Sequence, residues 1–398
     1  MSTHHLDPAT SLTGHRVHRS RVRLADGRDL FYFDDTEPWV SGAVRDGEDT
    51  RDLPPLGPSA RMRRDPLTGE WVPLASHRMN RTHLPPREAC PLCPTQPGGH
   101  PSEVPAADYD VVVFENRFPS LNPRDPGPDS LVDGEGLWPE RAAAGRCEVV
   151  CFTSDHESTF AELPVARVRT VVEAWADRTA ELSRLPHVRS VFCFENRGRE
   201  IGVTLTHPHG QVYAYPYVPP RSAQHVARAA EHHAATGRDL LGDVLAAERR
   251  SARRVVLSGE HWTAFVPAAA RWPVEVHLVP HRHVLDLSGL GGAERDELAV
   301  LYRRLLRLLD GFFVDDDGGP ITLPYIAGWF AAPFGPEREG DPATLPRLHL
   351  QVFSVLRAAG KLKYLAGSES GQGAWVSDTT PERIADRLAE VAGQDGYA

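Results

Sequence analysis

The sequence has little of what three large classes of protein require. No apolar run approaches the roughly 20 residues of a membrane-spanning helix, so we expect no membrane-embedded part. No block of lysine and arginine stands out and the formal net charge is −10, which argues against nucleic acid as a partner. The five cysteines are odd in number and lack a disulfide-scaffold spacing. Because residues 1–7 also lack the basic and apolar regions of a signal peptide, we expect a cytoplasmic protein.

The most informative stretch that is present is His207-Pro208-His209-Gly210-Gln211. On a strand, residues two apart face the same side, so both histidines would share one face while the proline stiffens the backbone. Gly210 lets a ligand approach the main chain, and Gln211 offers a neutral donor and acceptor. A neutral imidazole beside an amide suits attack on phosphorus, and the other imidazole could bind a metal. Two histidines at this spacing also occur in surface loops and cores, so the flanking sequence decides.

Further motifs flank this stretch in a defined order. They lie at residues 64–71, 76–81, 90–93 (Cys-Pro-Leu-Cys), 114–118, 154–156, 194–198, 202–204 and 363–369. In order and spacing they resemble the galactose-1-phosphate uridylyltransferase family of the histidine-triad superfamily, from about residue 63 to about residue 391. The resemblance implies a ping-pong reaction of galactose metabolism, in which UDP-glucose and a hexose-1-phosphate exchange a uridylyl group through a uridylyl-histidine. His209 would be the nucleophile, and Gln211 would stabilise charge on a phosphoryl oxygen.

A metal site is expected next to this nucleophile. Cys90 and Cys93 supply two thiolates at the spacing of a metal clamp, and His156 and His207 are the best partners. Four such ligands would close a tetrahedral site, so we expect one structural Zn²⁺ per chain that fixes the strand of His207 and thereby places His209. A redox pair and incidental cysteines are the alternatives, although prolines beside both cysteines favour a loop over a redox context.

The resemblance also implies a substrate-binding set spread along the chain. Arg78 and Arg81 could clamp a phosphate, unless they belong to a solvated basic loop. Asn116 and Asn196 would contact uracil, ribose or phosphate, and Thr204 would contact phosphate. The other members of the set are Arg117, Gly202, Val203, Gln211, Lys363, Tyr364, Ser368 and Glu369. The family places segment 363–369 at the hexose end, reached from a neighbouring subunit, which implies a homodimer with shared active sites.

Hydrophobic periodicity predicts both strands and helices along the chain. Strands are expected at 109–114, 148–152, 190–194, 211–217, 262–266, 274–279 and 348–354, and helices at 168–185, 222–250, 293–309 and 381–391. Residues 209–213 (His-Gly-Gln-Val-Tyr) have an echo at 349–353 (His-Leu-Gln-Val-Phe), where Arg347 replaces the preceding histidine. This echo indicates a degenerate repeat, with chance similarity as the alternative.

The fold class expected from the resemblance is α+β, with two related histidine-triad-like halves that are each an antiparallel sheet with helices packed on it. The expected division is a poorly ordered extension at 1–20, a half with zinc and nucleophile at 21–240, and a degenerate half at 241–398. Family members often carry a second metal, described as iron, held by one glutamate and three histidines. The corresponding positions here are His225, Phe330, His349 and Gln351, so a second iron site is not expected.

Two other functions stay open from the sequence. A related phosphorylase or adenylyltransferase of nucleotide sugars or dinucleotides could use the same histidine chemistry, because neutral amides serve uracil and adenine alike. A non-catalytic zinc-containing nucleotide-binding protein is the other, although a binding module has no need of a nucleophile. The mass of the protein after incubation with UDP-glucose or ADP-glucose separates these possibilities.

Overall fold

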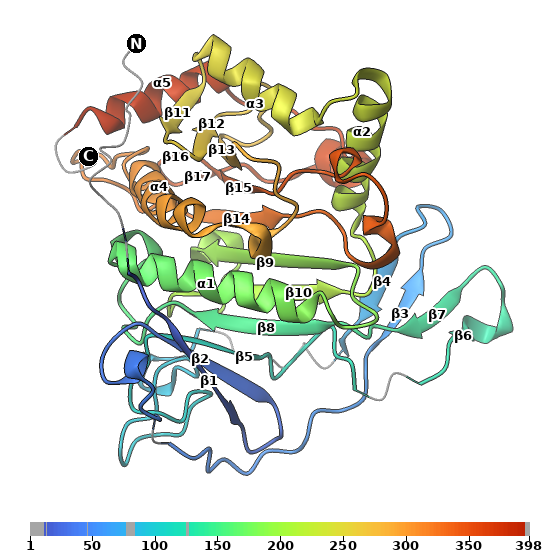
Figure 1. Cartoon of the computed structure of the whole chain (residues 1–398), viewed down its shortest axis with the longest axis vertical. Coiled ribbons are helices and arrows are strands. Elements are labelled where there is room, and N and C mark those ends of the chain that lie inside the picture. Colours follow the sequence, from blue (N-terminus) through green and yellow to red (C-terminus); the bar gives the residue numbers. More distant parts are fainter. Residues whose placement is uncertain (1–11, 13, 46, 77–83, 125–126, 395–398) are drawn as a thin grey trace.

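The computed structural model describes residues 12, 14–45, 47–76, 84–124 and 127–394. Its centre is one sheet of eleven strands, and each pairing between neighbours is antiparallel (Figure 1). From one edge to the other the strands are β1 (His18–Arg23), β2 (Asp29–Asp34), β5 (Val111–Glu115), β8 (Arg146–Cys151), β10 (His209–Tyr215), β9 (Ser190–Arg197), β14 (Tyr325–Phe330), β15 (His349–Ser354), β13 (Val274–Pro280), β12 (Trp262–Phe265) and β11 (Val255–Ser258).

Helices cover both faces of this sheet. On one face lie α1 (Val165–Leu182), α4 (Gly292–Asp310) and α5 (Pro381–Ala392). On the other face, over the second half of the sheet, lie α2 (Pro220–Thr236) and α3 (Leu240–Ser251). Helices α1 and α4 lie side by side across the sheet (Figure 1). Trp175 of α1 packs against Tyr302 of α4 and Trp329 of β14, with ring centroids 6.3 Å apart in each pair. Their apolar sides and the alternate residues of the strands beneath form the main core.

The sheet consists of two related halves joined edge to edge. Strands β9 and β14 pair at its middle, and the order outward from them is equivalent on both sides: β10, β8 and β5 on one, β15, β13 and β12 on the other. Helix α1 follows β8 and helix α4 follows β13, so the connections match as well. The expected fold class is therefore confirmed, with the two antiparallel sheets fused into one.

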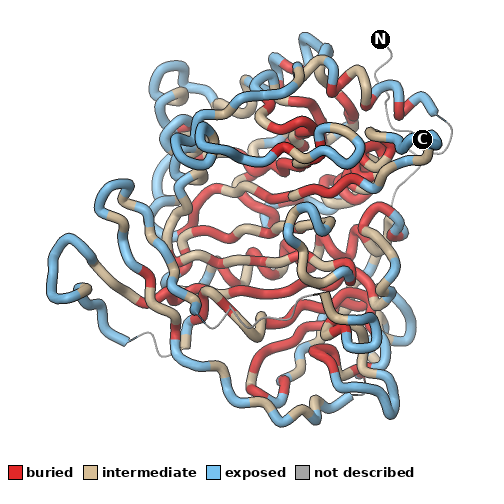
Figure 2. The backbone as a smooth tube through the Cα atoms, turned by 180° about the vertical axis from the view of Figure 1, so that it is seen from behind, coloured by how far each residue is buried: buried red, intermediate tan, exposed pale blue. Residues whose placement is uncertain are grey.

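A smaller antiparallel sheet projects from the first half (Figure 1). It is built from β4 (Trp71–Leu74), β3 (Arg61–Arg64), β7 (Pro139–Ala142) and β6 (Ser130–Leu131). The residues of this projection are mostly exposed or half-buried, whereas the central strands of the main sheet are mostly buried (Figure 2). A hairpin of β16 (Leu356–Ala358) and β17 (Lys361–Leu362) leads to segment 363–378.

Some expected boundaries differ from the observed ones. The expected helical region at 222–250 is two helices, because Gly237 adopts a left-handed conformation with φ of 69° and ends α2. The expected extension at 1–20 overlaps β1 at residues 18–20, while residues 1–11 and 13 lie outside the described residues. Within the described part of the chain, none of the helices combines the length and apolarity of a bilayer span.

Candidate active site and metal centre

The side chain of His209 lies on the face of the sheet opposite α1. Along β10 the alternate residues Gly210, Val212 and Ala214 are buried, whereas His209 and Gln211 are half-buried. Strand β10 pairs with β8 on one side and with β9 on the other. The side chains of His209 and Gln211 are therefore held by a central strand of the sheet. This alternation follows from the pleat of the strand and sets the two polar groups on one face.

The tautomer of His209 follows from one hydrogen bond. Its Nδ1 lies 2.8 Å from the backbone carbonyl oxygen of His207. Because a carbonyl can only accept, Nδ1 carries the hydrogen and Nε2 carries the lone pair. Burial lowers the pKa of His209, so the ring is neutral at pH 7. A neutral imidazole with a free lone pair on Nε2 is the form that can act as a nucleophile.

A pocket of about 250 Å³ opens beside these side chains. Five of the expected substrate and catalytic residues line it, namely Asn116, Arg117, Thr204, His209 and Gln211. The other lining residues were not among the expected site residues; they are Pro91, Leu92, Glu103, Phe114, Phe118, Val149 and Leu205. The pocket is therefore apolar on several sides and has a few convergent polar groups, as small-molecule sites commonly do.

Charges at the pocket are partly compensated by the protein. The Glu103 carboxylate forms ion pairs with Arg28 at 2.6 Å and with Arg51 at 2.9 Å. Arg117 lies with its guanidinium carbon 5.6 Å from the centre of the Phe118 ring. The Arg117 guanidinium offers a planar set of donors in the pocket that His209 also lines, which suits a phosphate group.

Other residues of the expected set lie elsewhere. Asn196 lies on β9 and pairs with Ile326 of β14. It is not among the described residues that line the pocket. Gly202 ends a short 3-10 turn with φ of 82°, and Val203 follows it in the connection that leads to Thr204. Arg78 and Arg81 lie outside the described residues.

Segment 363–369 forms a compact loop of its own. The ammonium of Lys363 donates to the Val376 backbone oxygen at 2.5 Å and to Asp378 at 3.0 Å, and it lies 3.6 Å from Glu369. Tyr364 is 79% exposed, and Ser368 lies in a short π-helical turn. The described lining of the pocket includes no residue of this loop, so the loop does not complete the pocket of its own chain.

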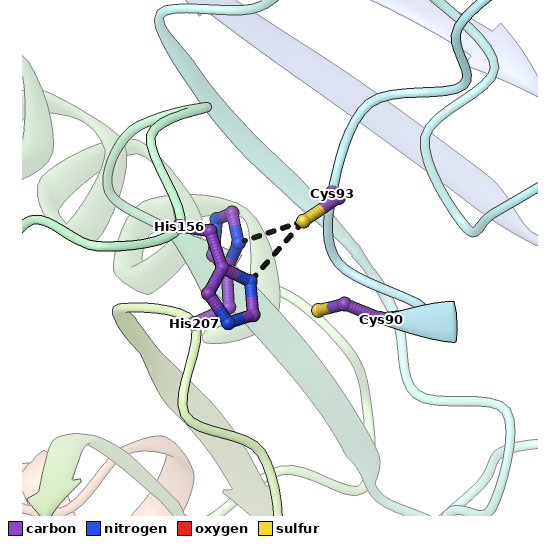
Figure 3. A group of neighbouring side chains, drawn as sticks. All are labelled: Cys90, Cys93, His156 and His207. Carbon is purple, nitrogen blue, oxygen red and sulfur yellow. Dashed lines mark hydrogen bonds between the residues drawn. The ribbon is translucent and has the colours of Figure 1, made fainter. Parts of the chain in front are cut away.

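The four expected metal ligands converge on one point (Figure 3). One ligand atom from each of Cys90, Cys93, His156 and His207 lies within 4.8 Å of all the others. Nδ1 of His156 is 3.2 Å and Nδ1 of His207 is 3.5 Å from the sulfur of Cys93, and both rings turn toward it (Figure 3). Two sulfurs and two imidazole nitrogens at this spacing form a donor set for a tetrahedral metal ion.

The outer hydrogen bonds of these histidines fit metal binding. Nε2 of His207 is 2.8 Å from the backbone oxygen of Thr153, and Nε2 of His156 is 3.1 Å from the Thr206 hydroxyl. The Thr153 carbonyl can only accept, so His207 carries its hydrogen on Nε2 and turns the Nδ1 lone pair toward the sulfurs. Burial lowers the pKa of His207 to about 4, which keeps the ring in its ligand form.

The positions of the family's second metal hold a different set of side chains. Phe330 stacks on His349 with ring centroids 5.4 Å apart, and His225 packs 5.2 Å from Phe330. The Gln351 amide nitrogen lies 2.9 Å from Nε2 of His349, and Arg221 donates to the Gln351 oxygen at 2.7 Å. A hydrocarbon ring, an occupied imidazole lone pair and a nearby cation do not fit a metal ion.

Comparison with known proteins agrees with this geometry. Models of the galactose-1-phosphate uridyl transferase N-terminal and C-terminal domains match residues 58–219 and 223–395. A galactose-1-phosphate uridylyltransferase of Streptomyces lividans is 46% identical over 94% of this chain and 98% of its own. One of Thermotoga maritima is 35% identical over 83% and 98%. A solved uridylyltransferase structure superposes with a TM-score of 0.71 at 32% identity, covering 83% of this chain and 98% of its own.

Proposed function

The chain belongs to the galactose-1-phosphate uridylyltransferase family, and we propose that it converts UDP-glucose and galactose-1-phosphate into glucose-1-phosphate and UDP-galactose. The observation that carries this proposal is the pocket in which a neutral His209 lies with Gln211, Asn116, Arg117 and Thr204. These five residues come from three segments of the chain, at 116–117, 204 and 209–211. An imidazole nucleophile among neutral amides and one guanidinium suits a nucleotide phosphate.

The reaction proceeds in two displacements at the same phosphorus. Nε2 of His209 attacks the α-phosphorus of UDP-glucose, an N–P bond forms, and the P–O bond to glucose-1-phosphate breaks with the electron pair leaving on that phosphate. A phosphate oxygen of galactose-1-phosphate then attacks the same phosphorus, the N–P bond breaks, and His209 regains its lone pair. Throughout, the hydrogen stays on Nδ1 of His209 and is donated to the His207 carbonyl oxygen, which orients the ring and stabilises the charge that the ring acquires.

The other pocket residues bind and orient the substrate. Gln211 donates from its amide to a phosphoryl oxygen as charge develops in the transition state. Arg117 pairs with the phosphates, Thr204 donates its hydroxyl to one of them, and Asn116 binds the nucleoside. Asn196, Gly202 and Val203 shape the approach to the pocket from the β9–β10 side, and Arg78 and Arg81 complete the phosphate clamp.

The metal is zinc, bound once per chain by Cys90, Cys93, His156 and His207. The mixed set of two sulfur and two nitrogen donors, all within 4.8 Å of one another, supports a structural ion with four protein ligands. A zinc ion bound there would anchor His207, whose carbonyl oxygen accepts from Nδ1 of His209. We expect no metal ion at the second site, because Phe330 and the Gln351–His349 hydrogen bond take the places that ligands would need.

The enzyme works as a homodimer in the cytoplasm. Five free thiols support a reducing compartment. The loop that holds Lys363, Tyr364, Ser368 and Glu369 lines no part of its own pocket and exposes Tyr364, which supports a role at the partner's hexose site. Mixed dimers of His209→Ala and Lys363→Ala chains test this. If the loop acts across the interface, each mixed dimer should contain one site with both residues wild type, and activity should return. If the loop acts within its own chain, mixing should restore no activity.

The mass of the intact protein tests the proposed reaction directly. After incubation with UDP-glucose and no acceptor, the protein should gain the mass of one UMP, and galactose-1-phosphate should remove it. Incubation with ADP-glucose serves as the comparison. A gain of AMP in preference to UMP would overturn the uridylyl specificity, and the absence of any gain would overturn the covalent mechanism.

A further inference from the structure

Tyr109 lies between the metal centre and the nucleotide pocket. Its side chain belongs to the segment just before β5 and is 1% exposed. The hydroxyl lies 2.9 Å from the backbone oxygen of Leu92 and 2.8 Å from Nε2 of His207. One of these partners lines the pocket and the other is a metal ligand, so a single hydroxyl touches both sites.

The direction of each hydrogen bond follows from the chemistry of the groups. The Leu92 carbonyl can only accept, so the Tyr109 hydroxyl donates its hydrogen to Leu92. The Tyr109 oxygen is then left to accept, and the hydrogen on Nε2 of His207 is the donor, shared with the Thr153 carbonyl. This arrangement keeps the Nδ1 lone pair of His207 directed at the cysteine sulfurs. The relay runs from the metal ligand through the phenol to the pocket wall.

The pocket wall at this point is the metal-binding loop itself. Pro91 and Leu92 stand between the two cysteine ligands, and both line the pocket. The loop is also held at Pro91, whose backbone oxygen accepts from the amide of Glu103 at 2.9 Å. A shift of the cysteine sulfurs therefore moves the surface that the nucleotide contacts, and the Tyr109 hydroxyl fixes this surface relative to His207.

We propose that Tyr109 is a positioning residue that couples metal binding to nucleotide binding. The proposal rests on the function and the zinc site proposed above. Nucleotide in the pocket holds Leu92 in place, Leu92 holds the Tyr109 hydroxyl, and the hydroxyl holds the metal ligand His207. By thermodynamic linkage, a nucleotide that tightens zinc binding is itself bound more tightly by the zinc-loaded protein, by the same factor.

The test is the zinc affinity of the purified enzyme, measured by equilibrium competition with a chelator in the absence and presence of saturating UMP. In the wild type, UMP should strengthen zinc binding by about 5-fold or more. Tyr109→Phe removes only the hydroxyl and leaves the Thr153 bond to His207, so the variant should still bind one zinc. The effect of UMP on its zinc affinity should fall to less than about 2-fold, and KM for UDP-glucose should rise more than kcat falls.

Tyr302→Phe is the matched control. Tyr302 is also 1% exposed but lies in α4 within the main core, so its loss of a hydroxyl should leave the UMP effect at the wild-type value. Cobalt in place of zinc gives a second measurement, because UMP should change the visible spectrum of wild-type and Tyr302→Phe proteins and leave that of Tyr109→Phe unchanged.

Each outcome decides a separate point. An equal UMP effect in wild type and Tyr109→Phe, or no UMP effect in the zinc-loaded wild type, would overturn the coupling. A wild-type protein that binds no zinc would overturn the metal assignment and the coupling with it. UMP binding measured on that same sample by calorimetry would then show whether the nucleotide pocket survives without the metal, so the two failures remain distinguishable.

Discussion

The two halves of the sheet carry the same pair of side chains, His209 with Gln211 in β10 and His349 with Gln351 in β15. In both halves Nδ1 of the imidazole donates to the carbonyl two residues earlier, at 2.8 Å in the first and 3.0 Å in the second. In the first half the ring lines a pocket. In the second half the Gln351 amide occupies Nε2 at 2.9 Å, and Arg221 of α2 holds Gln351 in turn.

The neighbours of the glutamine explain the difference. In the first half Gln211 lies between Val149 and Phe194, whereas in the second half Gln351 lies between His277 and Gly328. In addition, helix α2 places Arg221 against Gln351 and His225 against Phe330. The strand pattern therefore sets the tautomer of each histidine, and the side chains around it decide whether its lone pair is available for chemistry.

The largest expected effect separates the two histidines. His209→Ala should lower turnover by at least about 10⁴-fold, because no covalent intermediate can form, while fold and zinc content stay intact. His349→Ala should keep turnover within a few fold and lose about 2–4 kcal/mol of unfolding free energy, because it empties a buried ring site. Steady-state kinetics and urea unfolding measure both. A His209→Ala variant with more than a hundredth of wild-type turnover would contradict the nucleophile assignment.

Metal loss should affect the first half more than the second. Cys90→Ser should lower the zinc content and the melting temperature together, because zinc binding is linked to folding. Hydrogen exchange should then rise in β5, β8 and β10 more than in β12, β13 and β15. Cys193→Ser, a buried cysteine on β9 outside the ligand set, is the matched control and should retain one zinc. A full zinc complement in Cys90→Ser would remove Cys90 from the site.

The two glutamines should differ in the same sense. Gln211→Ala should lower kcat by about 10²–10³-fold, the usual cost of losing one donor to a developing oxyanion. Gln351→Ala should leave kcat near the wild-type value and lower stability by about 1–3 kcal/mol, because Arg221 and His349 lose their buried partner. The measurements are kcat and the free energy of unfolding for both variants. Equal losses of kcat would show that both halves take part in the chemistry.

A pH-dependent difference is expected on the face of the sheet that α1 and α4 cover. Glu195 lies opposite Gly210 on β9, where the second half has Trp329 opposite Leu350. Burial raises the pKa of Glu195 to about 7 from 4.5, so its protonated form is favoured in the folded state, where Tyr325 donates to it. Its contribution to stability is complete below pH 4.5 and is lost as the pH rises through 7, by about 3 kcal/mol.

Glu195→Gln isolates this contribution. The variant keeps an acceptor for Tyr325 but has no proton to lose, so its stability advantage over the wild type should grow from pH 5 to pH 8. Urea unfolding at several pH values measures the difference between the two proteins. A difference that stays constant over this range would show that folding does not raise the pKa of Glu195.

Much of the fold and of the site could be predicted from the sequence, and the reasons for the rest are physical. Periodic apolar segments such as α1 and α4 were located to within a few residues, because helical spacing survives in the pattern. Strand β14 was not expected, since Gly328 weakens its strand pattern. Gly328 is required there because a Cβ would lie 2.5 Å from the Phe192 ring, a contact that only the fold creates.

The site divides in the same way. Cys90, Cys93, His156 and His207 could be grouped because their ligand types are chemically distinctive, and the structure brings them together. Pro91, Leu92, Glu103 and Val149 could not be found, since apolar and ion-paired side chains carry no chemical signature until the fold lines a pocket with them. The position of Pro91 and Leu92 between two ligands was the one available signal.

Mapping the uridylyl group on the protein tests the central claim most directly. The enzyme is incubated with UDP-glucose without acceptor, digested at a pH that preserves the N–P bond, and sequenced by mass spectrometry. We expect one UMP per chain on His209, none on His349 or His207, and none anywhere in His209→Ala. A UMP group on His349, or an adduct that survives in His209→Ala, would contradict the account.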